Sequence, residues 1–266
     1  MEAAAAATGA INEATPITGV SARRFTRRRA PRVTVVVPTL NEERNLPFVI
    51  AALPIGVDEL VLVDAQSTDG TVAIARELWP DVRIVEQHGR GKGDALALGF
   101  AAATGDIIVT IDGDGSTDPA EIPKFVAALV GGADMAKGTR FAAGGGSDDL
   151  TPVRRLGARR LTTLVNVLFG TEFTDLCYGF NAFWRECLPS LVTPAGFEVE
   201  TSMHISAARA GLAIVEVPSF ERERLYGASN LRTFRDGSRV LRTILAARFS
   251  AAPAPEPAPD PAPARI

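Results

Sequence analysis

The chain has 266 residues, of which 46% are hydrophobic and 22% are charged, and its 28 basic and 31 acidic side chains leave a net charge of −3. This length and composition predict one large domain with a buried core, and the near-neutral charge argues against a nucleic-acid-binding protein. Two cysteines and two histidines are too few for a disulfide framework or a zinc cluster, which favours a reducing, cytosolic setting. No stretch reaches the roughly 18 uninterrupted apolar residues of a membrane span.

The two ends of the chain differ in composition from its centre. Residues 1–31 begin with an alanine run and contain five arginines within seven positions, without the apolar core of a secretory signal, which predicts a disordered arm. Residues 251–266 consist mainly of alanine and proline and predict a disordered tail. The folded domain is therefore expected at residues 32–250.

Short β-branched runs alternate with helical patterns between these ends, which is typical of an α/β fold with a mostly parallel, twisted, Rossmann-like sheet flanked by helices. Buried strands are predicted at residues 33–37, 59–63, 82–85, 106–111 and 133–137. Helices are predicted at about residues 43–53, 71–79, 93–104 and 119–131, after residue 152, and at 231–248. The helix at 119–131 has a capping pattern, in which Asp118 caps the first turn and Glu121 reaches back to the cap.

Polar segments follow three of the predicted strands, beginning at Pro38, Asp64 and Asp112. Ligands in open α/β sheets bind at the carboxyl ends of strands, so these segments are expected to line one cleft. Asp112 and Asp114 lie two residues apart after an extended strand, so both carboxylates can point to one side, and the glycine after each leaves room for a ligand. Two carboxylates leave most of an Mg²⁺ or Mn²⁺ shell open for a substrate diphosphate, and the alternative is that both are simple turn residues.

A glycine-rich loop at residues 89–93 precedes the third predicted helix, whose amino end can hold phosphate. The loop matches neither common phosphate-binding fingerprint, because Glu86 stands where a P-loop needs glycine, and Gly93 follows Lys92 where Ser or Thr is required. A plain turn is an equal alternative for this loop.

These segments occur in the order found in a known family. Residues 35–42 (VVVPTLNE), 64–71, 91–93 and 105–119 resemble the family 2 glycosyltransferases with the GT-A fold. Residues 222–231 (RERLYGASNL) are similar to the Arg-x-x-Gly-x-Ser-Lys-Leu stretch of the dolichol- and polyprenol-phosphate mannose and glucose synthases. The match extends from residue 33 to about residue 235, so the resemblance implies a single GT-A domain.

The resemblance implies roles for individual residues. The residues implied to hold the nucleotide sugar are Pro38, Thr39, Asn41, Glu42, Asp64, Lys92 and Asp112. A divalent cation, Mg²⁺ or Mn²⁺, is implied on Asp112 and Asp114, with Ser116 as a further ligand. The residues implied to bind the acceptor phosphate are Arg140, Arg222, Arg224 and Ser229.

Two departures from the family pattern affect what the resemblance implies. Ala65 and Gln66 stand where many members have Asp-Gly, which leaves UDP against GDP open as the donor nucleotide. Asn230 replaces the usual lysine and removes one expected positive charge from the phosphate site. Either Arg222 takes the place of that lysine or no residue does.

A sugar nucleotide loses its diphosphate while positive charge develops at the anomeric carbon, so catalysis needs a metal and cations to stabilise the leaving group. An acceptor phosphate is already anionic and attacks without a protein base, whereas an alcohol acceptor needs one. Asp175 is the candidate base, because residues 174–180 resemble the family's Asp-x-x-x-Gly-Phe segment, and accepting hydrogen bonds from the sugar or the backbone is its alternative role. Glu198 and Glu200 either contact ligand or simply start the next helix.

Two basic helical surfaces bear on the acceptor. In the helix after residue 152, Arg155 and Arg159 share a face and are candidate acceptor-phosphate residues, with a plain solvated face as the alternative. The last helix carries a stripe formed by Arg235, Arg239 and Arg242. This layout fits a helix lying on an anionic bilayer, or an ordinary amphipathic helix packed on the domain. The two cysteines and His204 are expected to be packed structural residues.

The sequence therefore predicts an inverting hexosyltransferase that moves a sugar from a donor of the GDP-mannose or UDP-glucose type to a polyprenyl phosphate. It would require a divalent cation and act as a peripheral protein at the cytoplasmic face of a membrane. One alternative keeps the donor chemistry but uses a soluble phosphorylated or hydroxyl acceptor. Another is an inactive nucleotide-sugar-binding protein, which has less need of a metal on the leaving group, so the Asp112/Asp114 pair argues against it.

Overall fold

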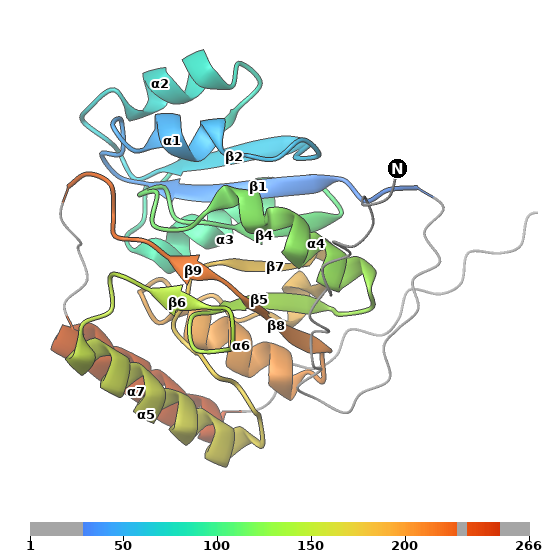
Figure 1. Ribbon diagram of the computed structural model, residues 1–266, viewed down its shortest axis with the longest axis vertical. Coiled ribbons are helices and arrows are strands. Elements are labelled where there is room, and N and C mark those ends of the chain that lie inside the picture. The colour runs from blue at the N-terminus through green and yellow to red at the C-terminus, as the bar shows by residue number, and fades with distance from the viewer. Residues whose placement is uncertain (1–28, 228–232, 251–266) are drawn as a thin grey trace, which may run out of the picture.

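The computed structural model describes residues 29–227 and 233–250, which are organised around a central β-sheet with helices on both faces (Figure 1). The strands of this sheet are β1 (Val33–Thr39), β2 (Glu59–Asp64), β3 (Arg83–Glu86), β4 (Ile107–Thr110), β5 (Met135–Thr139), β7 (Asn181–Trp184) and β8 (Ile214–Pro218). They lie in the order β3-β2-β1-β4-β7-β5-β8. Neighbouring strands are parallel except where β7 pairs with β4 and β5, so the predicted mostly parallel sheet is confirmed.

The residues of β1 show why the sheet is covered on both sides. Val35 and Val37 belong to one buried cluster and Val36 to another, because successive side chains of a strand point to opposite faces. The helices over the first cluster are α1 (Leu46–Ala51), α2 (Thr71–Leu78) and α4 (Ile122–Val130). The helices over the second are α3 (Lys92–Ala102), α5 (Pro152–Phe169), α6 (Val199–Arg209) and α7 (Thr233–Phe249).

Polar side chains cap the first turns of two helices, as local patterns in the sequence indicate. The side chain of Thr151 caps α5 by accepting a hydrogen bond from the backbone N–H of Arg154 at 3.3 Å. Asp118 caps the short 3₁₀ helix Pro119–Glu121, which leads into α4, by accepting from the N–H of Ala120. Glu121 does not reach back to this cap, so the predicted reciprocal bond is wrong. Its two carboxylate oxygens accept instead from Lys124 and from the hydroxyl of Ser219.

The predicted elements agree with the observed ones in type and nearly in length. All five predicted strands are present, with ends that differ by at most two residues. The first helix is shorter than the predicted 43–53, because residues 42–45 form a turn before α1 begins. The sequence did not predict β7 or β8, nor the two-stranded sheet of β6 (Gly146–Ser147) and β9 (Phe220–Glu221).

Several predictions concern residues that the structure does not describe. Residues 1–28 of the predicted arm, the predicted tail at 251–266, and residues 228–232, which include Ser229 and Asn230, lie outside the described residues. Within residues 29–227 and 233–250, no helix is long and apolar enough to cross a membrane.

Candidate active site

A cleft of about 520 Å³ lies where β1, β2 and β4 end, within the usual range for ligand pockets. Its strand side is lined by Pro38, Thr39, Ala65 and the loop from Asp112 to Ser116. Its other side is lined by residues of α5 and α7, which pack against each other. The three polar segments that follow the predicted strands thus contribute to one cleft, as expected from the sheet topology.

The loop after β4 holds the two candidate metal ligands. The carboxylate of Asp112 lies 2.5 Å from the ammonium of Lys92, and Asp114 lies 3.5 Å from the guanidinium of Arg224. The backbone N–H of Ser116 donates to Asp114 at 3.0 Å, which orders the loop. Both carboxylates line the cleft and hold cations of the protein itself, so a divalent cation would replace side-chain cations there.

The two glycines of this loop have a packing role that was not predicted from the sequence. A side chain at Gly113 would meet Thr39 at 2.9 Å, and one at Gly115, whose φ is +77°, would meet Leu225 at 2.7 Å. The glycines therefore let the loop pack closely against β1 and against the segment before α7. Gly113 also lines the cleft, and the room that the glycines leave for a ligand stays a prediction.

Lys92 stands at the first position of α3, inside the glycine-rich segment. Its ammonium contacts both Asp112 and the carboxylate of Glu200 on α6, the latter at 2.8 Å. Burial works against the charged form of Lys92, but these two carboxylates outweigh it and raise the pKa above its ordinary value. Gly91 and Gly93 lie against the backbone carbonyls of residues 195 and 194, so the glycines provide close backbone packing around a permanently charged lysine.

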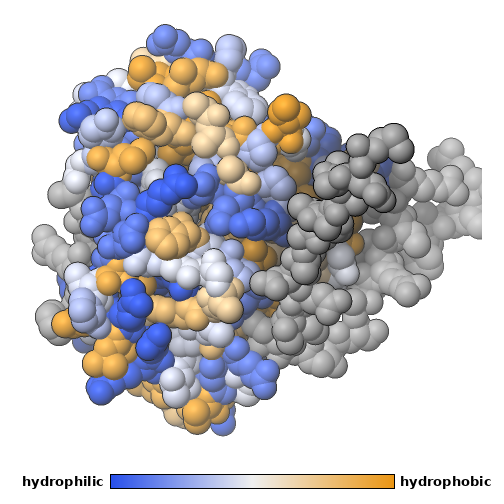
Figure 2. Space-filling view, in the orientation of Figure 1, coloured by the Kyte–Doolittle hydropathy of each residue, from blue (hydrophilic) through white to orange (hydrophobic). Residues whose placement is uncertain are grey.

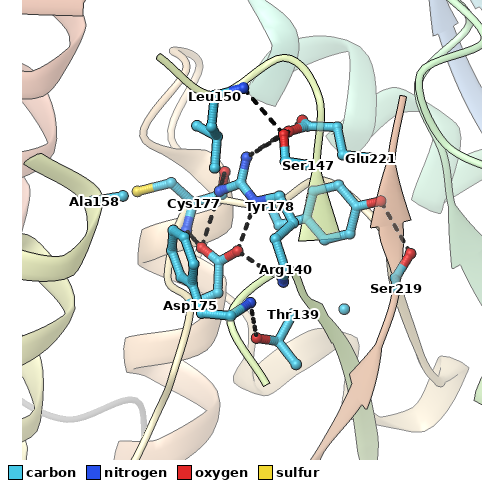
Figure 3. A network of polar contacts seen from close by, with 12 residues as sticks. Thr139, Arg140, Ser147, Leu150, Ala158, Asp175, Cys177, Tyr178, Ser219 and Glu221 are labelled. Atoms are coloured by element: carbon cyan, nitrogen blue, oxygen red, sulfur yellow. Dashed lines mark hydrogen bonds and ion pairs between the residues drawn. The ribbon is translucent and has the colours of Figure 1, made fainter. Parts of the chain in front are cut away.

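Arg140 follows β5 and is the centre of a buried polar network (Figure 3). Its guanidinium makes a paired interaction with Asp175, with Nε at 2.6 Å and Nη2 at 3.0 Å from the two carboxylate oxygens. Nη1 contacts Glu221 of β9 at 3.1 Å, and the guanidinium lies over the ring of Tyr178 at 4.9 Å. The cleft is lined by Arg140 and Glu221, while Asp175 supports the arginine from behind.

This environment affects the candidate base. Burial alone would raise the pKa of Asp175, but the charge and hydrogen bonds of Arg140 outweigh burial and lower it. Both carboxylate oxygens are engaged by Arg140, and the N–H of Cys177 donates to one of them. A carboxylate with a lowered pKa and occupied oxygens is a poor proton acceptor, so this arrangement favours a role in holding Arg140.

A second buried ion pair supports the loop that carries Asp175. Lys137, which is fully buried in β5, pairs with Glu216 of β8 at 2.8 Å and also donates to the backbone carbonyl of Asp175. Glu216 accepts from the backbone N–H of Thr174 at 3.0 Å. The sequence analysis missed this pair, although a lysine inside a predicted buried strand already requires an acidic partner.

His204 belongs to the same buried layer. Its ring nitrogens contact the carbonyl of Leu176 at 3.1 Å and the side-chain oxygen of Asn181 at 2.8 Å. Burial lowers its pKa well below the ordinary value, so the ring is neutral. The expectation that His204 is a satisfied structural residue is confirmed.

Residues 222–227, here called the crossing segment, run over the loop that holds the carboxylates. Arg224 makes an ion pair with Glu42, and the N–H of Leu225 donates to the carbonyl of Asp114 at 3.3 Å. Burial is the main reason that the pKa of Glu42 is raised, partly offset by Asn45 and Arg224. Arg222 is exposed and pairs with Asp118 at 2.9 Å, outside the residues that line the cleft.

The remaining predicted donor residues lie at the ends of β1 and β2. Asp64 is buried and accepts from the N–H of Ser67 at 2.9 Å, while the side-chain oxygen of Asn41 accepts from the N–H of Thr68 at 2.8 Å. Asn41 therefore ties the end of β1 to the turn after β2, while Asp64 orders that turn and also accepts from the hydroxyl of Thr39 at 3.5 Å. Neither is among the residues that line the cleft, whereas the neighbouring Thr39 is.

The arginines of α5 divide between the cleft and the outer surface. Arg155 and Arg159 are exposed and do not line the cleft, and Arg159 lies over the ring of Phe141 at 5.3 Å. Arg154 does line the cleft, where it pairs with Asp149 at 2.8 Å. Helical spacing could have identified Arg154 as the inward-facing arginine, because it lies four, seven and eleven residues before the inward-facing positions 158, 161 and 165.

The charges around the cleft indicate what it can bind. The acidic side chains that line it are Glu42, Asp112, Asp114, Asp149, Glu200, Glu221 and Asp236, and the basic ones are Lys92, Arg140, Arg154 and Arg224. A diphosphate would add negative charge to a site that already has an acidic excess, so it fits only with a cation. The described residues contain no ready-made group of three or more metal-binding side chains. Asp112 and Asp114 nevertheless fit a cation whose shell is completed by the substrate.

The sheet, the carboxylate pair at the end of β4, and a cleft that contains both acidic and basic side chains are features of a GT-A glycosyltransferase. The profile of glycosyl transferase family 2 matches residues 34–191, and the chain belongs to this family. The polyprenol monophosphomannose synthase of Mycolicibacterium smegmatis is 31% identical over 218 residues, which cover 77% of this chain and 82% of that protein. The glycosyltransferase AglJ of Haloferax volcanii is 32% identical over 216 residues, which cover 77% and 68%.

Solved structures extend the comparison to ligands. Glucosyl-3-phosphoglycerate synthase from Mycobacterium tuberculosis, in complex with Mn²⁺, UDP and glucosyl-3-phosphoglycerate, superimposes with a TM-score of 0.66 at 31% identity. The alignment covers 82% of this chain and 80% of that one. The same enzyme with Mg²⁺ and UDP gives a TM-score of 0.65 at 30% identity. The GT-A fold and the glycosyltransferase class predicted from the sequence are confirmed.

Proposed function

We propose that the protein transfers a hexose from a GDP-mannose or UDP-glucose type of donor to a polyprenyl phosphate, with inversion and with a divalent cation. The proposed donor and cation are supported by one observation, which is that Asp112 and Asp114 face a cleft with an excess of acidic side chains. The acceptor half is supported by the relative named polyprenol monophosphomannose synthase.

The donor would lie along the strand ends. Its nucleoside would occupy the part of the cleft formed by Pro38, Thr39 and Ala65, with Asp64 and Asn41 holding these strand ends in place. Its diphosphate would lie near Lys92 and the carboxylate pair. The absence of a carboxylate at position 65 leaves both bases as candidates, and the UDP complexes of glucosyl-3-phosphoglycerate synthase make UDP-glucose the first donor to test.

The transfer then requires positive charge near the leaving diphosphate and an anionic nucleophile. A cation on Asp112 and Asp114, with Ser116 near it, would supply Lewis-acid stabilisation of the departing diphosphate. Lys92 would be released from Asp112 and would keep its ion pair with Glu200. Arg140 and Arg224 would hold the acceptor phosphate, which attacks without a protein base. Asp175 is then needed to position Arg140, which agrees with its lowered pKa.

A peripheral contact with a membrane at its cytoplasmic face is also part of this proposal. α7 exposes Leu241, Leu245 and Phe249, with 40%, 45% and 87% of each residue accessible, beside the exposed arginines of its predicted stripe. α5, which packs beside α7, exposes Val153, Leu156 and Val167. Figure 2 shows apolar and charged side chains interspersed over the lower part of the molecule, where α5 lies. Such a mixture suits an interface with anionic lipid.

The test uses the full chain with Mn²⁺, labelled UDP-glucose or GDP-mannose, and two acceptors in parallel. A short-chain polyprenyl phosphate should receive label that partitions into organic solvent. The second candidate is a soluble phosphorylated acceptor, which the likeness to glucosyl-3-phosphoglycerate synthase favours. Label that stays in water and passes to phosphoglyceric acid supports this candidate and contradicts the lipid acceptor. Binding of a donor without transfer to any acceptor supports the inactive binding protein.

A further inference from the structure

The wall of the cleft formed by α5 and α7 differs from the rest of its lining because it is mainly apolar. Leu150, Val153 and Leu161 line it on the α5 side, and Val240 lines it on α7. A nucleoside diphosphate and a hexose have no large aliphatic group that would occupy such a wall. The apolar lining is therefore explained either by another bound molecule or by the packing of α5 against α7.

Two glycines within helices line this wall, and close packing of α5 against α7 does not require glycine at either position. A side chain added at Gly157 of α5 or Gly237 of α7 would meet no atom of the described residues within 4 Å, apart from its chain neighbours and the backbone of its own helix. Glycine inside a helix is less favourable than alanine, so neither residue is favoured by the helix itself. Both line the cleft. They differ from Gly113 and Gly179, where an added side chain would collide with neighbours, and their effect is to keep the wall open.

The inner end of this wall adjoins the proposed phosphate site. Ala158 of α5 faces Cys177, whose carbonyl accepts a hydrogen bond from Arg140 at 3.1 Å (Figure 3). Arg154, one turn before Ala158, adds a second guanidinium to the cleft. Arg154 of α5 and the adjoining Arg140 thus lie near one end of the wall, and aliphatic side chains of both helices lie along it. This distribution matches a molecule with a phosphate head and a hydrocarbon tail.

The outer end continues onto exposed apolar side chains. Leu156 on α5 and Leu241 on α7 are exposed on helices that pack beside each other. A hydrocarbon chain that leaves the cleft here would follow these apolar side chains past the charged groups that also line the wall, which are Asp149, Arg154 and Asp236. A soluble phosphorylated acceptor has no group that would use this path.

We propose that the hydrocarbon next to the acceptor phosphate binds between α5 and α7, over Gly157 and Gly237, and leaves the cleft by this route. The proposal rests on the lipid-phosphate acceptor argued above. It adds a binding subsite for the first isoprenoid units, and it makes the two glycines the residues that keep this subsite open.

The first experiment varies the acceptor on the wild-type enzyme. Prenyl phosphates of one to four isoprenoid units should show KM values that fall about tenfold with each of the first units, because each buries apolar surface, and then level off. A KM that does not change over this series overturns the proposed subsite, even when transfer to lipid phosphate is observed. If no prenyl phosphate is used and phosphoglyceric acid is glycosylated, the proposed function itself has failed.

The second experiment fills the open space. Gly157→Leu and Gly237→Leu should each raise KM for the four-unit acceptor at least tenfold more than KM for the one-unit acceptor, so the ratio of the two KM values reports the subsite. Gly157→Ala should change KM little and raise the melting temperature, because the helix gains propensity. Thr163→Leu, at an exposed position of α5 outside the cleft, is the matched control and should behave as wild type.

Equal KM values for wild type and both leucine variants with the four-unit acceptor would overturn the proposal. If a leucine variant also loses donor hydrolysis and its circular dichroism spectrum, it has not folded. In that case the chain-length series on the wild type decides.

Discussion

The side of the cleft formed by strand ends and the side formed by α5 and α7 are built in different ways. On the strand side the charged groups are already paired, because Lys92 contacts Asp112 and Arg224 contacts Glu42. On the helix side the lining is mainly apolar, and Arg154 is in a half-buried ion pair. A diphosphate and its cation must therefore exchange partners on the first side, whereas an acceptor needs mainly space on the second.

This difference predicts how each side responds to mutation. Strand ends are held by the ladder of the sheet, so a substitution of a charged residue there changes charge more than it changes geometry. The helices are held by side-chain packing and carry exposed faces, so they tolerate more changes. We expect the largest losses at charged residues between β4 and Arg140, and smaller ones toward α5 and toward the nucleoside end.

The largest effect is expected from the carboxylate pair. Asp114→Asn should lower transfer by about 10³-fold, because it removes a ligand of the cation that stabilises the leaving group. Its melting temperature should stay near that of wild type, since Asp114 is partly exposed. Asp149→Asn, which also changes a carboxylate lining the cleft, is the control and should lose far less activity. Full wild-type activity in excess EDTA would contradict metal dependence.

The next effect concerns stability and compares two arginine–aspartate pairs. Asp175→Asn should lower the free energy of unfolding by about 3 kcal/mol, because it leaves the buried Arg140 without its main partner. Asp149→Asn, whose partner Arg154 is half-buried, should cost less than about 1 kcal/mol. Urea denaturation of both variants measures the difference. Equal costs would mean that burial does not distinguish the two pairs.

The same pair has a defined pH dependence. The pKa of folded Asp175 is lowered from its ordinary value of 3.8, so its contribution to stability is fully present above that pH. As the pH falls below 3.8 toward the folded-state pKa, the unfolded chain takes up a proton first and the contribution is lost. Thermal unfolding between pH 6 and pH 3 should therefore show a steeper decline for wild type than for Asp175→Asn. Parallel declines would contradict the ion pair.

A smaller effect is expected at the crossing segment. Arg224→Ala should raise KM for a polyprenyl phosphate roughly 10- to 100-fold, because a charged hydrogen-bond donor is lost, while hydrolysis of the donor by water continues. Arg222→Ala is the matched control, since Arg222 is exposed and pairs with Asp118 away from the cleft. If both variants lose acceptor binding equally, Arg222 supplies the charge that is missing at Asn230.

The same division explains how much the sequence could predict. The strand side depends on short local segments, in which Asp112 and Asp114 follow a buried strand, so the carboxylate pair and the GT-A fold could be predicted. The pair of Lys137 and Glu216 could not, because its members are register partners on two strands that lie 79 residues apart in sequence. β7 was missed because its four buried residues show no alternation that separates a strand from other buried segments.

The choice between neighbouring arginines on α5 was within reach of the sequence. Arg155 and Arg159 share a face, but only Arg154 continues the inward-facing stripe that includes Val165. The sequence does not show which element packs against that stripe, since α7 lies more than 60 residues further along the chain. The periodicity of a helix shows which residues share a face, whereas tertiary packing determines which residues that face contacts.

The smallest effect is expected at the nucleoside end, where Asp64 distinguishes two roles. The resemblance assigns Asp64 to the nucleotide, whereas the structure gives its carboxylate a partner in the turn, the N–H of Ser67 at 2.9 Å. Asp64→Ala should raise the Kd for UDP or GDP about three- to tenfold, because the turn after β2 loses its hydrogen bond to Ser67 and Thr39 of the cleft loses an acceptor for its hydroxyl. Turnover at saturating donor should change less than binding does. Calorimetric titration with each nucleotide, combined with a melting temperature, separates the roles: a lower melting temperature with both Kd values unchanged makes Asp64 a turn residue. A rise for only one nucleotide assigns it to recognition of that base.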